Sequence, residues 1–327
     1  MASSPHIFSD ITTRRIMLDV VIALLPATLA GAWFFGARVL LVSAATILSC
    51  VCAEYASRRI MKRDSTIGDL SAVVTGLLLS LNLPPSIEIW KAVVGGAIAI
   101  VLVKQIFGGI GQNFMNPALT ARVMLLISWG ASMTRWTAPG WAFSPAAGVD
   151  AVSSATPLAL AKTYFQTGAG LSGLPSYASL FAGSVAGCIG ETSAIALLLG
   201  GAYLLAKKVI TWHIPAAYIA TAAATSWAFG GAGGGLFAGD PLRHALSGGL
   251  LIGAIFMATD YSTSPMTKTG KLIMGVGCGL LTTVIRLYTG YPEGVSFSIL
   301  IMNVVTPLID KYTVPRAFGA PAKKGAF

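Results

Sequence analysis

The chain has 327 residues, of which 55% are hydrophobic and only 10% charged, and its mean hydropathy is +0.75. These values exclude an ordinary soluble globular protein and indicate an integral membrane protein surrounded by lipid. The formal net charge is +10, but the basic residues fall in short clusters between apolar runs, where the positive-inside rule predicts them. The charge therefore describes membrane topology, and no nucleic-acid partner is expected.

Ten segments approach the length of about 20 apolar residues that a transmembrane helix needs. The predicted spans are 16–35, 37–56, 67–83, 90–107, 115–131, 178–206, 212–230, 243–260, 272–289 and 295–311. The polar start of the chain leads directly into the first span, so we expect that span to act as an uncleaved insertion signal. The sequence thus predicts an all-α integral membrane protein with a single membrane domain over 1–327.

Lysine and arginine are distributed unevenly between the two sides of this ten-span arrangement. Fifteen fall on the side of the N-terminus and six on the other side, while Arg122 falls inside the fifth span. The positive-inside rule then places both termini in the cytoplasm. The loop 132–177 is accordingly expected outside the cytoplasm, and 312–327 is expected to be a cytoplasmic tail.

The two halves of the chain share a weak internal repeat. Four residue pairs match at a constant offset of 181 positions: Gly68 with Gly249, Pro84 with Pro265, Gly96 with Gly277, and Gly109 with Gly290. Five spans would then belong to each unit, 1–131 and 178–311. Because five is odd, the second unit would enter the membrane upside down, as in many transporters built from inverted repeats.

The sixth predicted span, 178–206, is too long for one straight crossing. Its 29 residues would form a helix of about 43 Å, against a hydrocarbon core of about 30 Å. We expect a break at GSVAGCIG, residues 183–190, and a helix that starts near Gly190. Glu191 would then lie in the first turn, where the helix dipole favours an anion. Glu191 is a candidate for an ion pathway, or it only satisfies free backbone amides there.

Other polar groups in the spans are expected to have ordinary roles. The acidic residues near span ends are expected to be solvated or interfacial: Asp19, Glu54, Asp69 and Asp260. The four cysteines lack the spacing of metal ligands, so we expect small buried side chains and no metal site: Cys50, Cys52, Cys188 and Cys278.

The loop GGIGQNFMNPALTAR, residues 108–122, lies between the fourth and fifth spans on the predicted cytoplasmic side. Its glycines and asparagines are poor helix formers but suit a backbone that dips into the protein, with side-chain amides pairing exposed carbonyls. The loop is therefore a candidate ligand-binding loop. The alternative is a purely structural re-entrant turn.

The segment GVDAVSSATPLALAK, residues 148–162, is small and weakly polar in an otherwise apolar chain. Thr156 followed by Pro157 predicts a helix start, with threonine as the N-cap and proline at the first helical position. This pattern alone describes a capped surface helix. However, an N-cap hydroxyl also lies where free backbone N–H groups and the helix dipole attract a phosphate.

The run DAVSSAT, from Asp150 to Thr156, resembles the flavinylation signature D-G-x-S/T-G-A-T, with Ala151 and Ser154 where glycine is usual. The final threonine of that signature carries FMN through a phosphoester bond. The whole chain resembles the RnfD/NqrB family of membrane redox subunits, and most closely the D subunit of the Rnf ferredoxin:NAD oxidoreductase. Supporting stretches include SAVVTGLLL (71–79), GGIGQNFMNPA (108–118), IGETSAIALLLGG (189–201), WHIPAA (212–217) and ATDYSTSPMTKTGKLIMG (258–275).

This resemblance implies a ten-helix inverted repeat like that of urea transporters, in a bacterial inner membrane. It implies that Thr156 carries covalent FMN on the periplasmic side, where a flavin transferase attaches it. Asp150 and Ser153 would serve transferase recognition and loop shape. A second, noncovalent flavin such as riboflavin would contact Asn113 and Asn116.

The implied activity is electron relay between ferredoxin and NAD within the Rnf complex, coupled to Na⁺ or H⁺ movement. Ferredoxin and NAD are expected on other subunits, because this chain has neither a cysteine cluster nor a dinucleotide fingerprint. No complete active site is therefore expected on this chain alone. The competing interpretation is an inverted-repeat transporter or channel for a small solute or ion, without redox activity.

Overall fold

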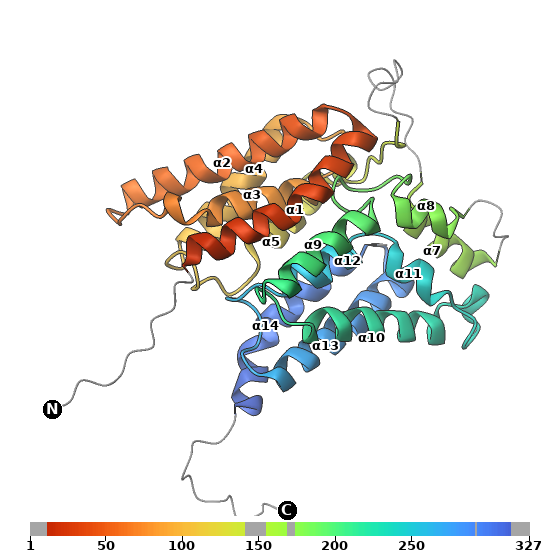
Figure 1. The fold of residues 1–327 in the computed structure, drawn as a ribbon. Helices are drawn as coiled ribbons and strands as arrows, with labels where there is room; N and C mark the ends of the chain where they lie inside the picture. The colour runs from red at the N-terminus through yellow and green to blue at the C-terminus, as the bar shows by residue number, and fades with distance from the viewer. Residues whose placement is uncertain (1–11, 141–154, 169–173, 292, 315–327) are drawn as a thin grey trace, which may run out of the picture.

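The computed structural model describes residues 12–140, 155–168, 174–291 and 293–314. Over these ranges the regular elements are helices joined by loops (Figure 1). The predicted all-α class is confirmed. Four helices are long and apolar enough to cross a membrane: α1, α2, α13 and α14, spanning Thr13–Phe35, Arg38–Ile60, Lys268–Tyr288 and Val295–Thr313.

The first half of the chain continues from α1 and α2 into shorter helices. These are η1 (Ile67–Asp69), α3 (Ser71–Leu81), α4 (Ile89–Ile98), η2 (Ala99–Gln105), α5 (Pro117–Ser128) and α6 (Gly130–Met133). The η2 segment is a π-helix that continues α4 directly. Such π segments inside α-helices occur frequently at functional sites.

The second half holds the remaining helices before α13 and α14. They are α7 (Pro157–Thr167), α8 (Tyr177–Ala182), α9 (Ala194–Ala206), α10 (His213–Phe229), η5 (Ala232–Gly234), α11 (Pro241–Leu246), α12 (Leu250–Ile252) and η6 (Gly253–Met257). Each of the ten predicted spans thus contains helix. Several are short or interrupted, an arrangement that membranes tolerate where protein surrounds the irregular backbone.

The predicted break in the sixth span is confirmed, but the predicted restart near Gly190 is wrong. Helix α8 ends at Ala182, and α9 begins only at Ala194, capped by the Ser193 side chain. The interrupted backbone instead pairs with the end of α3. The N–H groups of Ile189 and Gly190 donate to carbonyls of Leu83 and Leu81 at 3.1 and 2.8 Å. These bonds satisfy backbone groups that a helix would otherwise pair within itself.

Glycines allow the helices to pack closely. Helix α9 lies against α1, and α10 lies against α13 (Figure 1). A Cβ added to Gly200 of α9 would lie 2.1 Å from the Ala23 carbonyl oxygen, and one on Gly279 of α13 would lie 2.8 Å from the Tyr218 carbonyl oxygen. Small residues at such contacts let two backbones approach, as membrane helix pairs require.

The cysteine expectation holds only in part. Cys50, Cys188 and Cys278 are buried, but Cys52 is exposed. Cys50 and Cys52 are two positions apart on α2 and therefore point to different faces of that helix. The expectation that all four cysteines are buried was therefore wrong for Cys52.

The elements divide between two ends of the molecule. Helices α7, α8 and α11 gather at one end, whereas the start of α1 and the loops that follow α9 and η6 lie at the opposite end (Figure 1). Each end contains a cavity lined by residues singled out in the sequence.

Candidate functional site

Thr156 caps the first turn of α7. Its backbone is extended, and its Oγ1 accepts a hydrogen bond from the N–H of Ala159 at 3.1 Å. Pro157 begins the helix, so the predicted helix start is confirmed. Asp150 and Ser153 lie outside the described residues.

Thr156 is 7% exposed and lines a cavity of about 250 Å³. The wall of this cavity comes mainly from α5, α6, α7 and the start of α14, and most of its lining is apolar or aromatic. The larger side chains are Leu126, Met133, Trp136, Tyr291 and Phe297. Aromatic walls of this kind suit a flat conjugated ring, which packs against them by offset stacking or edge contacts.

Arg122 of α5 supplies the positive charge of this cavity. Its side chain is 5% exposed and pairs with Glu293. The guanidinium also donates to Asn82 Oδ1 at 3.3 Å and to Ser296 Oγ at 2.9 Å. In the sequence, Arg122 falls inside the fifth predicted span, and no role is predicted for it there. A lone cation inside an apolar span was the available signal.

Glu293 lies just before α14, where it lines the same cavity. Burial raises the pKa of its carboxyl group, and the neighbouring Arg122 guanidinium partly offsets that increase. No sequence pattern drew attention to Glu293, because it lies in a short polar loop where acidic residues are ordinary.

Glu191 does not lie in the first turn of α9, as the sequence had suggested. It precedes the N-cap Ser193 by two residues, and its Oε1 accepts a hydrogen bond from the N–H of Cys188 at 2.8 Å. A Cβ on Gly187 would lie 2.7 Å from that oxygen, so glycine leaves room for the carboxylate. The backbone of the interruption, and not the dipole of α9, positions this buried group. Ligand atoms of Cys188, Glu191 and Glu293 all lie within 4.8 Å of one another.

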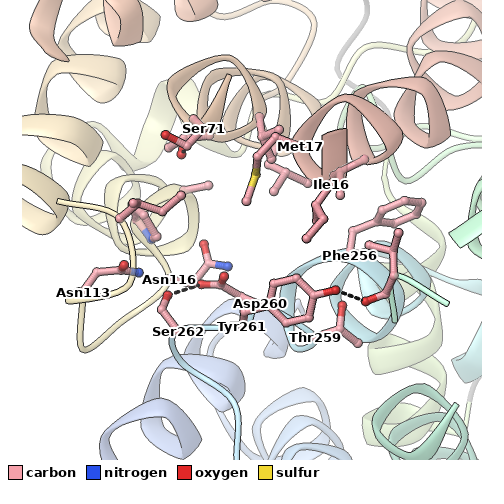
Figure 2. Close-up of a pocket in the computed structure, with 18 of the residues that line it drawn as sticks. Ile16, Met17, Ser71, Asn113, Asn116, Phe256, Thr259, Asp260, Tyr261 and Ser262 are labelled. Carbon is pink, nitrogen blue, oxygen red and sulfur yellow. Dashed lines mark hydrogen bonds between the residues drawn. The ribbon is translucent and has the colours of Figure 1, made fainter. Parts of the chain in front are cut away.

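A second cavity, of about 110 Å³, lies at the opposite end of the molecule and contains Asn113 and Asn116 (Figure 2). Asn116 caps α5, where its Oδ1 accepts from the N–H of Leu119 at 3.2 Å. Its Nδ2 donates to the Met257 carbonyl at 3.2 Å. Asn116 therefore joins α5 to the end of η6. The predicted pairing of side-chain amides with backbone in this loop is confirmed.

Asp260 shares this second cavity with the two asparagines (Figure 2). Its Oδ2 accepts hydrogen bonds from Ser262 Oγ at 3.1 Å and from Thr263 Oγ1 at 3.2 Å. The cavity is otherwise mainly apolar, with Met17 and Phe256 among its walls. It therefore combines an apolar chamber with a few convergent polar groups, as small-molecule sites commonly do.

Lys104, on the π-helix η2, lines the same cavity. Its Nζ donates to Glu54 Oε2 at 3.1 Å and to Ser71 Oγ at 2.5 Å. Glu54 is 0% exposed, so the expectation that it is solvated or interfacial was wrong. The helical sequence of α2 does not reveal that η2 brings a lysine to this carboxylate.

Comparison with known proteins identifies the family. A model described as the NQR2, RnfD, RnfE family matches residues 1–319. The chain belongs to this family. The resemblance predicted from the sequence is therefore confirmed, and the described cavities belong to a membrane protein of that family.

Similar proteins match over nearly the whole chain. The D subunit of the Na⁺-translocating ferredoxin:NAD⁺ oxidoreductase complex of Acetobacterium woodii is 48% identical over 321 residues, covering 98% of this chain and 95% of the relative. The D subunit of the proton-translocating complex of Clostridium ljungdahlii is 47% identical over 324 residues, covering 98% and 96%. The D subunit of the ion-translocating oxidoreductase complex of Halorhodospira halophila is 38% identical over 346 residues, covering 98% and 95%.

Proposed function

We propose that this chain is the D subunit of an ion-translocating ferredoxin:NAD oxidoreductase and carries FMN on Thr156 as an electron relay. Its partners are the other subunits of that complex, which bind ferredoxin and NAD. The observation that carries the proposal is the Thr156 hydroxyl, which caps a helix and lines a cavity with aromatic walls and one arginine. The identity to the D-subunit relatives supports the activity.

The residues present fit a flavin attached through its phosphate. The start of α7 offers backbone N–H groups to an anion at the Thr156 oxygen. Arg122 adds a guanidinium to the same cavity, and Trp136, Tyr291 and Phe297 supply aromatic walls. Bound FMN would supply the capacity to accept one or two electrons, while the protein contributes position and electrostatics. Asp150 and Ser153 would serve recognition by the flavin transferase.

The test of this proposal is Thr156→Ala in the native complex. The wild-type protein is expected to give a fluorescent flavin band on a denaturing gel, and the variant a dark band, because only the threonine oxygen can form the phosphoester. Thr163→Ala is the matched control, since Thr163 is an exposed threonine of the same helix. A dark wild-type band from cells that contain the transferase would contradict the proposal.

The same gel also tests the membrane topology, because it reports on which side of the membrane Thr156 lies. The proposed arrangement has ten membrane helices as two inverted five-helix units, 1–131 and 178–311, similar to urea transporters, with both termini cytoplasmic. Thr156 would then face the periplasm of a bacterial inner membrane. Flavin transferases implied by the family act outside the cytoplasm, so a fluorescent band supports this orientation and a dark band opposes it. The uneven distribution of basic residues supports it independently.

We further propose that the second cavity holds a noncovalent flavin such as riboflavin. Asn113 and Asp260 would offer polar groups to the ring edge, and Asn116 would keep the cavity open by holding α5 against η6. An Asn113→Leu complex is expected to release less flavin on acid extraction, while its covalent band stays unchanged. Ile110→Leu, which preserves an apolar wall, is the control. Unaltered extractable flavin in Asn113→Leu would contradict this assignment.

A further inference from the structure

A third, very small cavity is also lined by Thr156 and has no aromatic side chain among the described residues of its lining. Its lining includes Glu191, Thr192, Ser247 and Glu293, brought together from the interruption before α9, the end of α11 and the start of α14. Thr156 lines both this cavity and the larger one. The two spaces therefore share the residue proposed to hold the flavin.

Three buried oxygens around this cavity have no hydrogen-bond partner: Thr192 Oγ1, Ser247 Oγ and Glu293 Oε1. Thr192 and Ser247 are each only 2% exposed. Buried polar groups almost always have a partner, so an unpaired one requires an explanation. Three unpaired oxygens around one cavity indicate that a ligand interacting with oxygen belongs there.

The chemistry of the lining favours a small, hard cation. The polar side chains of its lining offer only oxygens: the hydroxyls of Thr156, Thr192 and Ser247, and two carboxylates. Ligand atoms of Glu191 and Glu293 lie within 4.8 Å of each other, so two carboxylates face one space. Hard cations bind oxygen ligands; Ca²⁺, for example, binds them at about 2.3–2.6 Å. The cavity volume is about 10 Å³, enough for one particle of the size of a water molecule.

The local charges decide the valence of this cation. Arg122 pairs with Glu293, and Arg286 donates to the Ser247 carbonyl at 3.0 Å. These two cations balance Glu191 and Glu293. The charge that changes is the one negative charge that an electron adds to the flavin on Thr156, which one monovalent cation neutralises and a divalent cation overcompensates.

We propose that Glu191, Thr192, Ser247 and Glu293 bind one dehydrated sodium ion beside Thr156. This inference rests on the proposed attachment of FMN to Thr156. The two hydroxyls favour sodium over a proton, because a protonated carboxyl group needs no further oxygen ligands. Arg122 does not occupy the position, since it reaches Glu293 Oε2 and leaves Oε1 unpaired.

The shared position of Thr156 couples this ion to electron transfer. Addition of one electron to the flavin adds one negative charge, and uptake of one sodium ion compensates it. The sodium ion therefore stabilises the reduced flavin, and reduction strengthens sodium binding by the same factor.

The test is a redox titration of the purified complex at fixed pH, with sodium replaced by choline at constant ionic strength. The flavin on Thr156 is identified as the component missing from Thr156→Ala. Its midpoint potential is expected to rise with sodium, by up to about 59 mV per tenfold increase for one electron and one ion. Ser247→Ala and Thr192→Val are expected to raise the sodium concentration required by about tenfold each. Glu293→Gln is expected to abolish the dependence.

Ser298→Ala is the matched control. Ser298 is a buried hydroxyl of α14 that bonds Tyr218 at 3.0 Å and Thr282 at 2.7 Å, away from the cavity. In Ser298→Ala, the flavin midpoint potential should depend on sodium as it does in the wild type. If the midpoint potential of the wild-type flavin does not depend on sodium, or depends only on pH, the sodium site is wrong. The flavin proposal would be unaffected by that result. A dark gel band shows instead that the proposed function has failed, and the sodium site with it.

Discussion

A complex that carries Thr156→Ala is expected to lose ferredoxin-dependent NAD⁺ reduction and the ion transport coupled to it. Without the hydroxyl there is no phosphoester, so the electron path lacks the relay in the cavity of Arg122 and Trp136. The measurement is NAD⁺ reduction by inverted membrane vesicles supplied with reduced ferredoxin, together with ion uptake into the same vesicles. Both signals should fall to background.

The controls separate a missing flavin from a damaged fold. Thr163→Ala removes an exposed hydroxyl from the same helix, where it donates to the Ala159 carbonyl at 3.1 Å, and should keep full activity. Thr156→Ser keeps an oxygen at the cap and should retain activity in proportion to the flavin it carries. Full electron transfer by a complex containing flavin-free Thr156→Ala would reject the relay role.

Lys104→Met is expected to destabilise the protein by roughly 3–5 kcal/mol, because it leaves a buried charge without its partner. Glu54 is 0% exposed and would keep only neutral hydrogen-bond donors, from Gln105 Nε2 at 2.9 Å and Thr66 Oγ1 at 2.6 Å. The measurement is the thermal unfolding midpoint of the purified complex in detergent. A large decrease is expected, with loss of flavin from the cavity that Lys104 lines.

An ion pair with one exposed partner provides the comparison. Glu88, whose side chain is 49% exposed, pairs with Lys91 at 2.5 Å. Glu88→Gln should cost no more than about 1 kcal/mol, because the exposed Glu88 is largely solvated and Lys91 keeps its hydrogen bond to Ser132 Oγ at 2.5 Å. Combining Lys104→Met with Glu54→Leu should recover part of the lost stability, because it removes the unpaired carboxylate. If Lys104→Met unfolds at the same temperature as the wild type, the buried Lys104–Glu54 pair does not stabilise the protein.

Local sequence patterns predicted the helical elements well. Apolar runs mark every helix-containing span, because the cost of placing polar groups in lipid is a property of each segment. The Thr156–Pro157 start and the break after α8 were also predictable, since capping and chain length act over a few residues. Even so, the start of α9 was misplaced, because backbone bonds from Ile189 and Gly190 to the end of α3 extend the break.

Contacts distant in sequence were not predictable in this way. The partner of Arg122 lies 171 positions away at Glu293, and that of Glu54 lies 50 positions away at Lys104. A single sequence describes each of these residues only as a charge near an apolar segment. Whether such a charge is solvated, paired or aimed into a cavity depends on which other helix packs beside it.

The sequence by itself determined that this is a helical membrane protein of the family to which it belongs, and which threonine caps a helix beside a phosphate-attracting turn. Only the tertiary structure decided that this threonine lines both an aromatic cavity and a small cavity that contains two carboxylates. The reason is that hydropathy and capping are summed along the chain, whereas the electrostatics of a buried site depend on side chains that folding brings together from separate helices.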